Sequence, residues 1–556
     1  MKELVNILRD FFKENKFLFL ISAVFIFIVP IHDIVLPLLY SQVVDAINHN
    51  KGFMKPLVFV TAILVVLQVL DFLSDYHDTR LLPKLQSFIR KRTMMKLLDK
   101  YEDAIEELEI GEINTKLVKL PSVVTSLFER IKNFMIPHML LHLSAIALYF
   151  YVDKYLGISL MLTVIIMYTV MSRGPSKCEN ITTNRDKAFS TLHEEIDDDL
   201  RNLFSIYGTN QKKQEIERLE KYNDVYNKFF RKTTLCSFGL RAVISPIVII
   251  FIVFMMFRIN TIVRNKTVNM SLFIPVFFIT LYIINSFMAL DDQLKHVIHD
   301  WGVVKSSMML LNPIKQNQPR QPRRRSADNK AKRGGIGLKN VSFQYPNSKT
   351  QILNNSTIHI NHGEAVAIVG DIGSGKSTVL KMLLGYYRPT SGTVYYDDKT
   401  YDQLSLQEIR RKIGYVPQVP VLFNRSIIEN ILYGNTKVTR HQVEQVLDEM
   451  GLLKEFMKHN DGLDTKVGKN GSVLSGGQRQ LVWCLRVMLS NPEVLILDEP
   501  TSSIDEKSKK ILRALLERFM KDKTVIMVTH DPAIVSFAKK FIVVEQGRVV
   551  SVKDRL

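Results

Sequence analysis

Six apolar blocks, each about 18 to 24 residues long, dominate the first half of this 556-residue chain. Each block is close to the length that an α-helix needs to cross the hydrocarbon core of a bilayer. They lie near residues 17–40, 54–75, 131–152, 155–172, 236–257 and 270–290. The fourth block contains no charged residue. The blocks therefore predict an α-helical polytopic membrane domain rather than buried helices of a soluble core.

The loops between the blocks predict the orientation of this domain. The connections after the first, third and fifth blocks are short, whereas those after the second and fourth run to about 55 to 65 residues and are densely charged. Lys and Arg number about ten in 76–130 and twelve in 173–235. The positive-inside rule places these long loops and both termini in the cytosol. We expect the membrane helices to continue into them as long cytoplasmic extensions.

A short amphipathic segment precedes the first block. In MKELVNILRDFFKENK, one helical face carries Leu4, Ile7, Leu8, Phe11 and Phe12, and charged residues fill the other face. This pattern is typical of a short helix that lies on the membrane surface.

The formal net charge of +19 is compatible with nucleic-acid binding or with a membrane protein that has basic cytoplasmic loops. The apolar blocks favour the second interpretation, so we expect a lipid bilayer and no nucleic acid as partner. Only three cysteines are present (Cys178, Cys236 and Cys484), without a CxxC pair, which excludes a disulfide scaffold and a cysteine-rich zinc site.

The composition changes twice along the chain. Residues 312–335 form a Pro-, Arg- and polar-rich stretch without periodicity, which predicts a flexible basic linker. The linker separates a transmembrane domain, 1–311, from an α/β domain, 336–556. Arg323–Ser326 also matches sequences favoured by basophilic kinases, and Asn265–Thr267 is a glycosylation sequon in a predicted outer loop. For Arg323–Ser326, we prefer the interpretation that it belongs to a solvated basic linker near an anionic leaflet.

A phosphate-binding loop follows the first clear strand of the α/β domain. Ala365–Val369 is an apolar run of strand length, and Gly370–Thr378 (GDIGSGKST) leads from it into an apolar helix pattern. Strand, glycine turn and helix in this order are the context that a P-loop requires. The glycines let backbone N–H groups approach phosphates at a helix N-terminus that favours anions. Lys376 is predicted to contact the β- and γ-phosphates of ATP, and Ser377 to ligate Mg²⁺.

A second acidic motif ends a predicted buried strand. Val494–Leu497 is wholly apolar and is followed by Asp498 and Glu499. The carboxyl edge of a parallel strand is where ligands bind in such sheets. Asp498 suits the coordination shell of Mg²⁺, and Glu499 is positioned to polarise the attacking water.

Between these motifs lies Leu474–Gln480, with the letters LSGGQRQ. Here the sequence resembles the ATP-binding cassette (ABC) superfamily, whose signature motif it matches letter for letter. The resemblance covers nearly the whole chain. Six spans followed by one nucleotide-binding domain resemble a half-transporter of the exporter type.

The resemblance implies roles for four further residues. Tyr345 matches the aromatic residue that stacks on adenine, and Gln418 the glutamine that senses Mg²⁺ and water. Asp505 matches the D-loop aspartate, and His530 the switch histidine that contacts the γ-phosphate. All of these stand in the order of the family.

The complete predicted site has three parts. Catalytic roles are assigned to Glu499, His530 and Gln418. ATP contacts are assigned to Tyr345, Gly370, Asp371, Ile372, Gly373, Ser374, Gly375, Lys376, Ser377 and Thr378, and to Ser475, Gly476, Gly477 and Gln478 of the signature. Mg²⁺ ligation is assigned to Ser377, Gln418 and Asp498.

The resemblance also implies a dimer, because in this family the signature of one domain closes over the P-loop ATP of the other. Intact motifs favour a homodimer, and a heterodimer with a related half-transporter stays open. The sequence departs from the family pattern at two places. Ser503-Ile504 replaces the more usual small–Leu pair of the D-loop, and Lys469 stands where exporters commonly carry Glu. By resemblance, Thr115–Val123 and Leu203–Gly208 are candidate coupling turns.

Ionisable residues within the spans are costly and suggest function. His32, Asp33, His138, His142 and Arg241 could line a polar substrate cavity or form helix–helix hydrogen bonds. A metal at His138 and His142 is a weaker alternative, because no third ligand is evident.

These features predict an ATP-hydrolysing exporter that moves a lipid, an amphiphile or a peptide out of the cytosol by alternating access. The alternative is a membrane regulator or channel that ATP binding gates without pumping. Such proteins often lack the catalytic glutamate, and Glu499 is present here.

Overall fold

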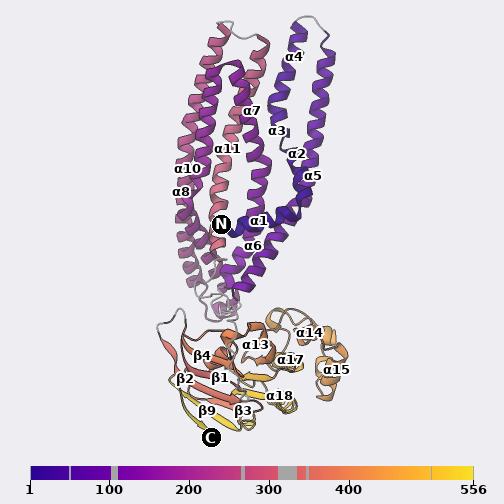
Figure 1. The fold of residues 1–556 in the computed structure, drawn as a ribbon, viewed down its shortest axis with the longest axis vertical. Coiled ribbons are helices and arrows are strands. Elements are labelled where there is room, and N and C mark those ends of the chain that lie inside the picture. The colour runs from indigo at the N-terminus through magenta and orange to yellow at the C-terminus, as the bar shows by residue number, and fades with distance from the viewer. Residues whose placement is uncertain are drawn as a thin grey trace. The chain divides into compact units, whose positions relative to one another are not determined.

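The structure is a computed structural model. It describes residues 2–48, 52–101, 110–264, 270–310, 335–345, 348, 350–502 and 504–554. The chain divides near residue 313 into two compact units, an α-helical one followed by an α/β one (Figure 1). The linker sequence Arg323–Ser326 and the sequon Asn265–Thr267 lie outside the described residues.

The first unit is built from long helices. They are α1 (Lys2–Glu14), α2 (Lys16–Phe25), α3 (Ile28–Pro30), the π-helix η1 (Ile31–Val35), α4 (Leu36–Asn48), α5 (Met54–Lys100), α6 (Ile110–Arg130), the π-helix η3 (Ile131–Met135), α7 (Ile136–Val152), α8 (Lys154–Arg201), α9 (Leu203–Gly208), α10 (Lys212–Arg264) and α11 (Met270–Leu310).

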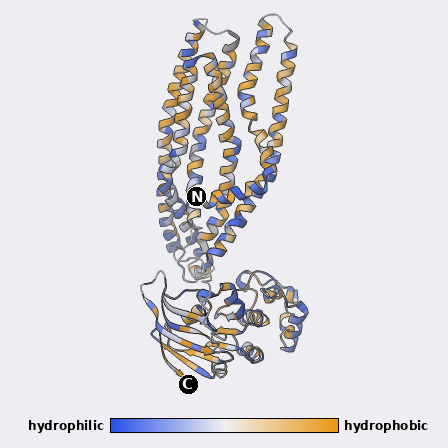
Figure 2. Ribbon diagram, viewed as in Figure 1, coloured by the Kyte–Doolittle hydropathy of each residue, from blue (hydrophilic) through white to orange (hydrophobic). Residues whose placement is uncertain are grey.

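The apolar content of these helices agrees with the six predicted blocks. Among the described residues, five helical runs are long and apolar enough to cross a membrane, and a shorter apolar helix covers Ile274–Leu290. Five of the predicted blocks fall within the long runs, and the sixth, 270–290, begins four residues before the shorter helix and ends with it. The helices α8 and α10 extend well beyond their apolar part, and their ends next to α9 are mainly hydrophilic (Figure 2). The predicted extensions of the spans are therefore continuous helix.

One of the two predicted turns is wrong. Thr115–Val123 lies inside α6, because Pro121 is accommodated within this helix rather than ending it. The connection between α5 and α6 falls earlier, at residues that the structure leaves undescribed. The other turn, Leu203–Gly208, is the short helix α9 between α8 and α10, and it exposes Phe204 almost fully.

The N-terminal helix α1 forms as predicted, but protein covers its apolar face. Leu4, Ile7 and Phe11 are buried in one cluster with residues of α5, α6 and α11, among them Leu85 and Val304. Phe12 remains partly exposed. The apolar stripe of α1 therefore stabilises the bundle itself.

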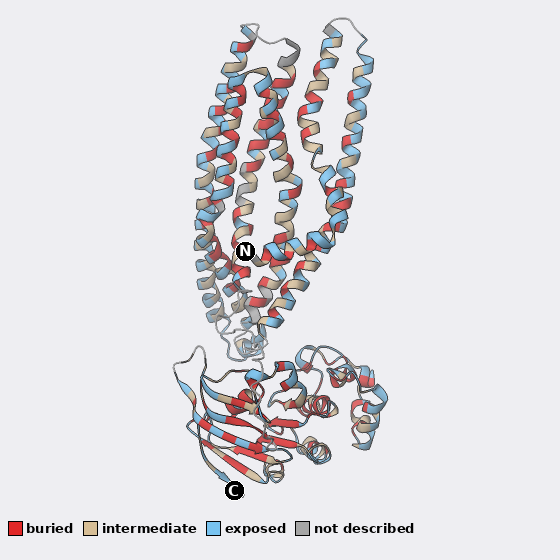
Figure 3. Ribbon diagram, in the orientation of Figure 1, coloured by how far each residue is buried: buried red, intermediate tan, exposed pale blue. Residues whose placement is uncertain are grey.

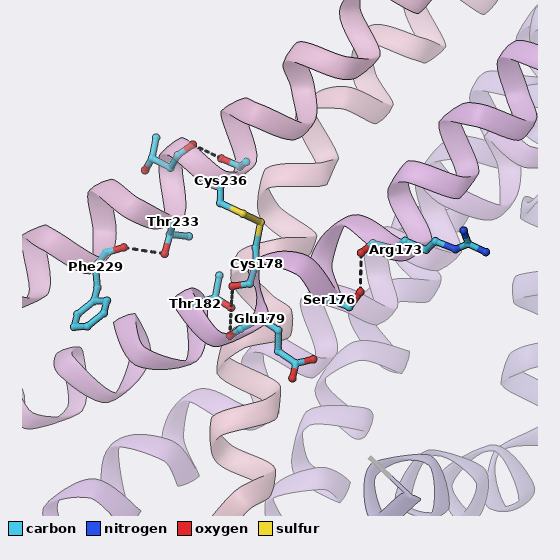
Figure 4. The surroundings of a disulfide bond; sticks show 10 residues. Arg173, Ser176, Cys178, Glu179, Thr182, Phe229, Thr233 and Cys236 are labelled. Carbon is cyan, nitrogen blue, oxygen red and sulfur yellow. Dashed lines mark hydrogen bonds between the residues drawn. A yellow bond between two sulfur atoms is a disulfide. The ribbon is translucent and has the colours of Figure 1, made fainter.

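A disulfide joins Cys178 of α8 to Cys236 of α10 (Figure 4). It is a single cross-link within a helical core, and Cys178 is fully buried. The sequence excluded a disulfide scaffold but did not anticipate this bond. The sequence contained a signal for this bond in the spacing of the two cysteines. Cys178 lies 25 residues before Leu203–Gly208 and Cys236 lies 28 residues after it. In an antiparallel helix pair joined at that segment, the two cysteines therefore lie at similar heights.

The second unit contains two sheets. The strands are β1 (Gly335–Gln344), β2 (Gln351–Asn361), β3 (Ala365–Val369), β4 (Ser391–Tyr396), β5 (Lys399–Thr400), β6 (Ile413–Val416), β7 (Val494–Asp498), β8 (Thr524–Val528), β9 (Lys540–Glu545) and β10 (Arg548–Lys553). An antiparallel sheet has the order β2-β1-β4-β5, and a second sheet has the order β10-β9-β3-β8-β7-β6. In the second sheet β9, β3, β8, β7 and β6 run parallel, and most of their residues are buried (Figure 3).

Helices cover these sheets. They are α12 (Lys376–Leu383), α13 (Leu406–Lys412), α14 (Ile427–Leu432), α15 (Arg440–Glu449), α16 (Leu453–Phe456), α17 (Gly476–Leu489), α18 (Glu506–Phe519) and α19 (Pro532–Val535), with short 3₁₀ turns η4 (Tyr401–Gln403), η5 (Gly462–Asp464) and η6 (Lys469–Gly471). Four of the α-helices begin with a reciprocal capping box, in which Ser or Thr pairs with Glu or Gln three residues later. The local sequence thus fixes where these helices start.

The close contact between α8 and α11 depends on Gly302. A Cβ atom at this position would lie 2.5 Å from the Cβ of Thr182 and 3.0 Å from its carbonyl carbon. We expect Gly302→Ala to push the two helices apart and to destabilise the helical unit by about 1–3 kcal/mol. The melting transition, followed by the fluorescence of the neighbouring Trp301 in a Trp483→Phe background, measures this loss.

Gly239→Ala on α10 is the matched control, because nothing lies within 4 Å of its added methyl group. It is expected to be neutral or to stabilise α10 by about 0.5–1 kcal/mol through helix propensity. Equal melting temperatures for the two variants would contradict the packing argument.

Candidate functional site

The P-loop connects the central strand β3 to α12, and two glycines make its path possible. Gly370 has φ of +152°, and a Cβ atom there would lie 2.1 Å from the carbonyl oxygen of Val544. Gly375 precedes α12 with φ of +105°. Side chains at these positions are excluded by the neighbouring backbone or by backbone strain. The path of this turn therefore requires glycine at both positions.

The loop places hydrogen-bond donors of Lys376 and Ser374 at the N-terminus of α12. Lys376 donates through Nζ to the carbonyl oxygens of Gly370 (2.7 Å) and Asp371 (2.8 Å). The Oγ atom of Ser374 is buried and has no partner among the described residues. Open space surrounds Gly373, and Ile372 is fully exposed. An anion with several oxygen atoms fits this arrangement, since it would satisfy these donors.

The last two residues of the predicted P-loop face different surroundings. Ser377 is exposed at the first turn of α12, whereas Thr378 is buried. The Thr378 hydroxyl lies 3.2 Å from the hydroxyl of Tyr345. The Tyr345 ring contacts Phe343 and Tyr387 edge-on, with ring centroids 4.9 and 5.3 Å away. The predicted adenine platform is thus tied to the P-loop helix.

The acidic motif ends β7 as predicted. Asp498 accepts a hydrogen bond of 3.2 Å from the hydroxyl of Tyr415 at the end of the neighbouring strand β6. Burial, reinforced by the charge of Glu499, raises the pKa of Asp498 above its usual range. A divalent cation would favour its ionised form. Together with the exposed hydroxyl of Ser377 and the side-chain oxygen of Gln418, Asp498 offers the oxygen ligands that Mg²⁺ prefers.

Glu499 is held in a strained backbone conformation. Its φ is +41°, and its N–H donates to the carbonyl oxygen of Val528 at 2.7 Å. Gln418 donates through Nε2 to the Glu499 carboxylate at 2.8 Å. Strain of this kind persists where the surrounding structure fixes a side chain for a task. His530 and Glu499 line the same hollow of about 630 Å³. The structure therefore brings the three predicted catalytic residues together.

The signature motif starts a different helix. Ser475 caps α17, which begins at Gly476, and it forms a capping box with Gln478. Gly477 lies directly against Ser508 of α18. The helix α17 packs against α14, α18 and β6, whereas α12 packs against β1, β2 and β7. Signature and P-loop are thus carried by separate parts of the domain.

The D-loop aspartate, Asp505, caps α18 by accepting a 2.7 Å hydrogen bond from the Ser508 N–H. Its neighbour Ser503 lies outside the described residues. Lys469, the other departure from the family pattern, begins the turn η6, in which Asn470 has positive φ.

Several residues without a predicted role connect these motifs. Gln480 of α17 donates to the carbonyl oxygen of Pro417 (3.2 Å), directly before Gln418, and Trp483 donates to that of Tyr415 (2.9 Å). Both bonds join the signature helix to the segment that carries Gln418. Sequence spacing could not reveal these contacts, because more than sixty residues separate the partners.

Within the helical unit, the predicted ionisable residues are distributed over two groups. His142 hydrogen-bonds Ser286 of α11 (3.1 Å) and the hydroxyl of Tyr168 (3.4 Å), so it joins three helices. His32 and Asp33 lie in η1, and His138, one turn before His142 on α7, interacts electrostatically with both Asp33 and His142. No group of three His, Cys, Asp or Glu side chains suited to a metal occurs among the described residues.

Two protein families match this chain. Residues 19–287 match the ABC transporter transmembrane region, and residues 353–502 match the ABC transporter family. The chain is 25% identical over 504 residues to a protein assigned as an export ATP-binding/permease protein in Rickettsia typhi, covering 89% of this chain and 86% of that protein. It is 25% identical over 555 residues to the "Probable multidrug resistance ABC transporter ATP-binding/permease protein" of Bacillus subtilis, covering 97% and 92%.

Two further similarities differ in extent. ABC transporter B family member 21 of Arabidopsis thaliana is 41% identical over 219 residues, which cover 39% of this chain and 17% of that protein. A solved structure of a bacterial Atm1-family ABC exporter with ATP bound has the same fold. The match has a TM-score of 0.82 at 19% sequence identity, and it covers 97% of this chain and 95% of the exporter chain.

The raised pKa of Asp498 has a testable consequence. Because the ionised carboxyl is disfavoured by burial, it costs stability at neutral pH and none below the ordinary aspartate pKa of about 4. Asp498→Asn is expected to raise the melting temperature of the nucleotide-free protein by a few degrees at pH 8, and less at pH 5. It should also abolish the stabilisation that Mg²⁺ adds to ATP. An Asp498→Asn protein that melts below wild type at pH 8 would refute this account.

Proposed function

Because this chain belongs to the ABC transporters, with an export-type membrane region fused to an ABC ATPase domain, we propose that it acts as a homodimeric half-transporter. It exports its cargo, a lipid, amphiphile or peptide, by alternating access. Its nucleotide domain and both termini lie in the cytosol. The basic long loops of the membrane region support this orientation.

The contact between Gln418 and Glu499 carries the catalytic part of the proposal. Glu499 orients a water molecule for attack on the γ-phosphate and accepts its proton. The Gln418 amide holds the carboxylate in position until nucleotide arrives. His530, which lines the same hollow, donates to the γ-phosphate. Lys376 leaves its two carbonyl partners to pair with the phosphates.

Mg²⁺, held by Ser377, Asp498 and Gln418, would neutralise phosphate charge when bound. The chain's own contribution is to bind ATP by the P-loop, stack its base on Tyr345, and place the carboxylate of Glu499.

The separation of signature and P-loop within one chain supports a dimer, either of two identical chains or with a related half-transporter. The N-terminus of α17 at Ser475 offers backbone N–H groups to an anion, and the P-loop of a second chain supplies that anion as bound ATP. Closure of two such sites converts the membrane region to its outward-facing state, and hydrolysis resets it.

Turnover should depend on Glu499. We expect Glu499→Gln in lipid nanodiscs to lose ATPase activity by about 10²–10⁴-fold, because the amide cannot accept a proton, while ATP binding is retained. Glu517→Gln is the matched control and should keep wild-type turnover, because Glu517 is exposed on α18 and its carboxylate pairs with Arg513 at 3.1 Å. A Glu499→Gln protein with full activity would disprove the assigned role. An inactive wild-type protein that binds ATP would favour the gated regulator.

Shared sites between two chains can be tested by complementation. Lys376→Ala and Ser475→Arg should each lower turnover at least about 10²-fold as homodimers. Co-expression of both chains should restore measurable turnover, because a mixed dimer retains one site with an intact P-loop and an intact signature. No recovery in purified mixed dimers would show that each chain forms its site alone.

A further inference from the structure

The first membrane-spanning run contains an acidic residue at mid-height. Asp33 lies near the middle of the apolar stretch Lys16–Ile47, within the π-helix η1. Short π-helices inside α-helices occur frequently at functional sites. An ionisable side chain at this depth is costly and marks a functional site by default.

Asp33 differs from two other carboxylates of the helical unit, because no Lys or Arg pairs with it among the described residues. Asp153 pairs with Arg258 at 2.6 Å, and Asp78 pairs with Lys132 and also accepts from Asn133. The ion-pair partner of Asp33 among the described residues is its neighbour His32, whose Nδ1 lies 2.7 Å from Oδ1. A neutral imidazole that donates this bond leaves the carboxylate charge in place.

Three hydrogen-bond acceptor atoms lie on Asp33 and the two histidines near it. The second carboxylate oxygen, Oδ2, accepts no hydrogen bond from the described residues. In the neutral tautomer in which Nδ1 of His32 donates to Asp33, its Nε2 is an acceptor. His138 of α7 interacts electrostatically with Asp33, and its Nδ1 donates to the Phe134 carbonyl oxygen (2.8 Å), so its Nε2 is also an acceptor.

Aromatic rings lie beside these acceptors. The ring of Tyr282 from α11 meets that of His32 edge-on, with centroids 5.7 Å apart, and Phe134 stacks on His138 at 4.0 Å. Both α7 and α11 contact η1. The His32 side chain is 44% exposed in the single chain, and that of Asp33 is 15% exposed. Rings of this kind also favour a cation at their faces.

We propose that Asp33, His32 and His138, with Tyr282, form a binding subsite for a protonated amine of the transported molecule. The site has one negative charge, and Oδ2 of Asp33 and the Nε2 atoms of both imidazoles are acceptors, so its complement carries both positive charge and N–H groups. This inference rests on the proposed export function and narrows its cargo to amphiphilic amines. A metal is not the complement, because these side chains do not form a metal-binding group.

The test uses three probes with one alkyl chain: decylamine, decyltrimethylammonium and decanol. Their binding to the full chain is measured in nanodiscs of zwitterionic lipid, corrected for empty nanodiscs, in the Glu499→Gln background. We expect decylamine to bind at least tenfold more tightly than decanol and more tightly than the quaternary cation, which lacks N–H groups. Asp33→Asn should remove this preference, and Asp33→Glu, which keeps the carboxylate, should retain it.

Asp224→Asn is the control, because Asp224 is exposed on α10 far along the chain from η1. It should leave all three affinities unchanged. Equal preference for decylamine in wild type and Asp33→Asn would overturn the subsite, and equal binding of the quaternary cation would overturn the role of the acceptors. Binding is measured in the Glu499→Gln background and does not require turnover. If the amine binds there but the protein with Glu499 intact fails to hydrolyse ATP, the export function is contradicted and the subsite is not.

Discussion

The helical unit depends on one constraint: a chain in hydrocarbon must satisfy its backbone hydrogen bonds internally. This constraint makes every apolar block a helix, and it explains why side chains rather than loops supply the polar contacts within the bundle. His142 bonds to Ser286 and Tyr168, and Tyr149 contacts Thr280 at 2.6 Å. The helices α8 and α10 then continue as helix beyond their apolar parts to the residues that flank α9.

In the nucleotide domain, backbone geometry rather than side-chain chemistry sets the site. Gly370 and Gly375 occupy conformations that exclude other residues, and Glu499 adopts positive φ although it is not glycine. The parallel strands β3, β7 and β8, which are largely buried, anchor these turns at their ends. A rigid sheet can impose strain on a loop because its own packing leaves no room to relax.

A second structural feature links parts of this site that the sequence separates. Arg486 of α17 is largely buried and donates to the Asn430 carbonyl oxygen (2.6 Å) and side chain (2.7 Å) on α14. With Gln480 and Trp483, it fixes the signature helix between α14 and the Gln418 segment. The segment that carries Gln418 is therefore hydrogen-bonded to the helix that Ser475 caps.

The sequence determined much of this protein by itself. Apolar length predicts the spans, and the order strand, glycine turn and helix predicts the P-loop, because both depend on neighbouring residues and on rules of local geometry. The capping box at Ser475 and Gln478 is local in the same sense. Only the tertiary structure decided what distant residues do together: the Tyr415–Asp498 contact, the Cys178–Cys236 bond, the position of Pro121 inside α6, and the convergence of Asp33 with His138 and Tyr282. Such contacts follow from how helices and strands pack, and packing depends on the whole set of side chains rather than on any one segment.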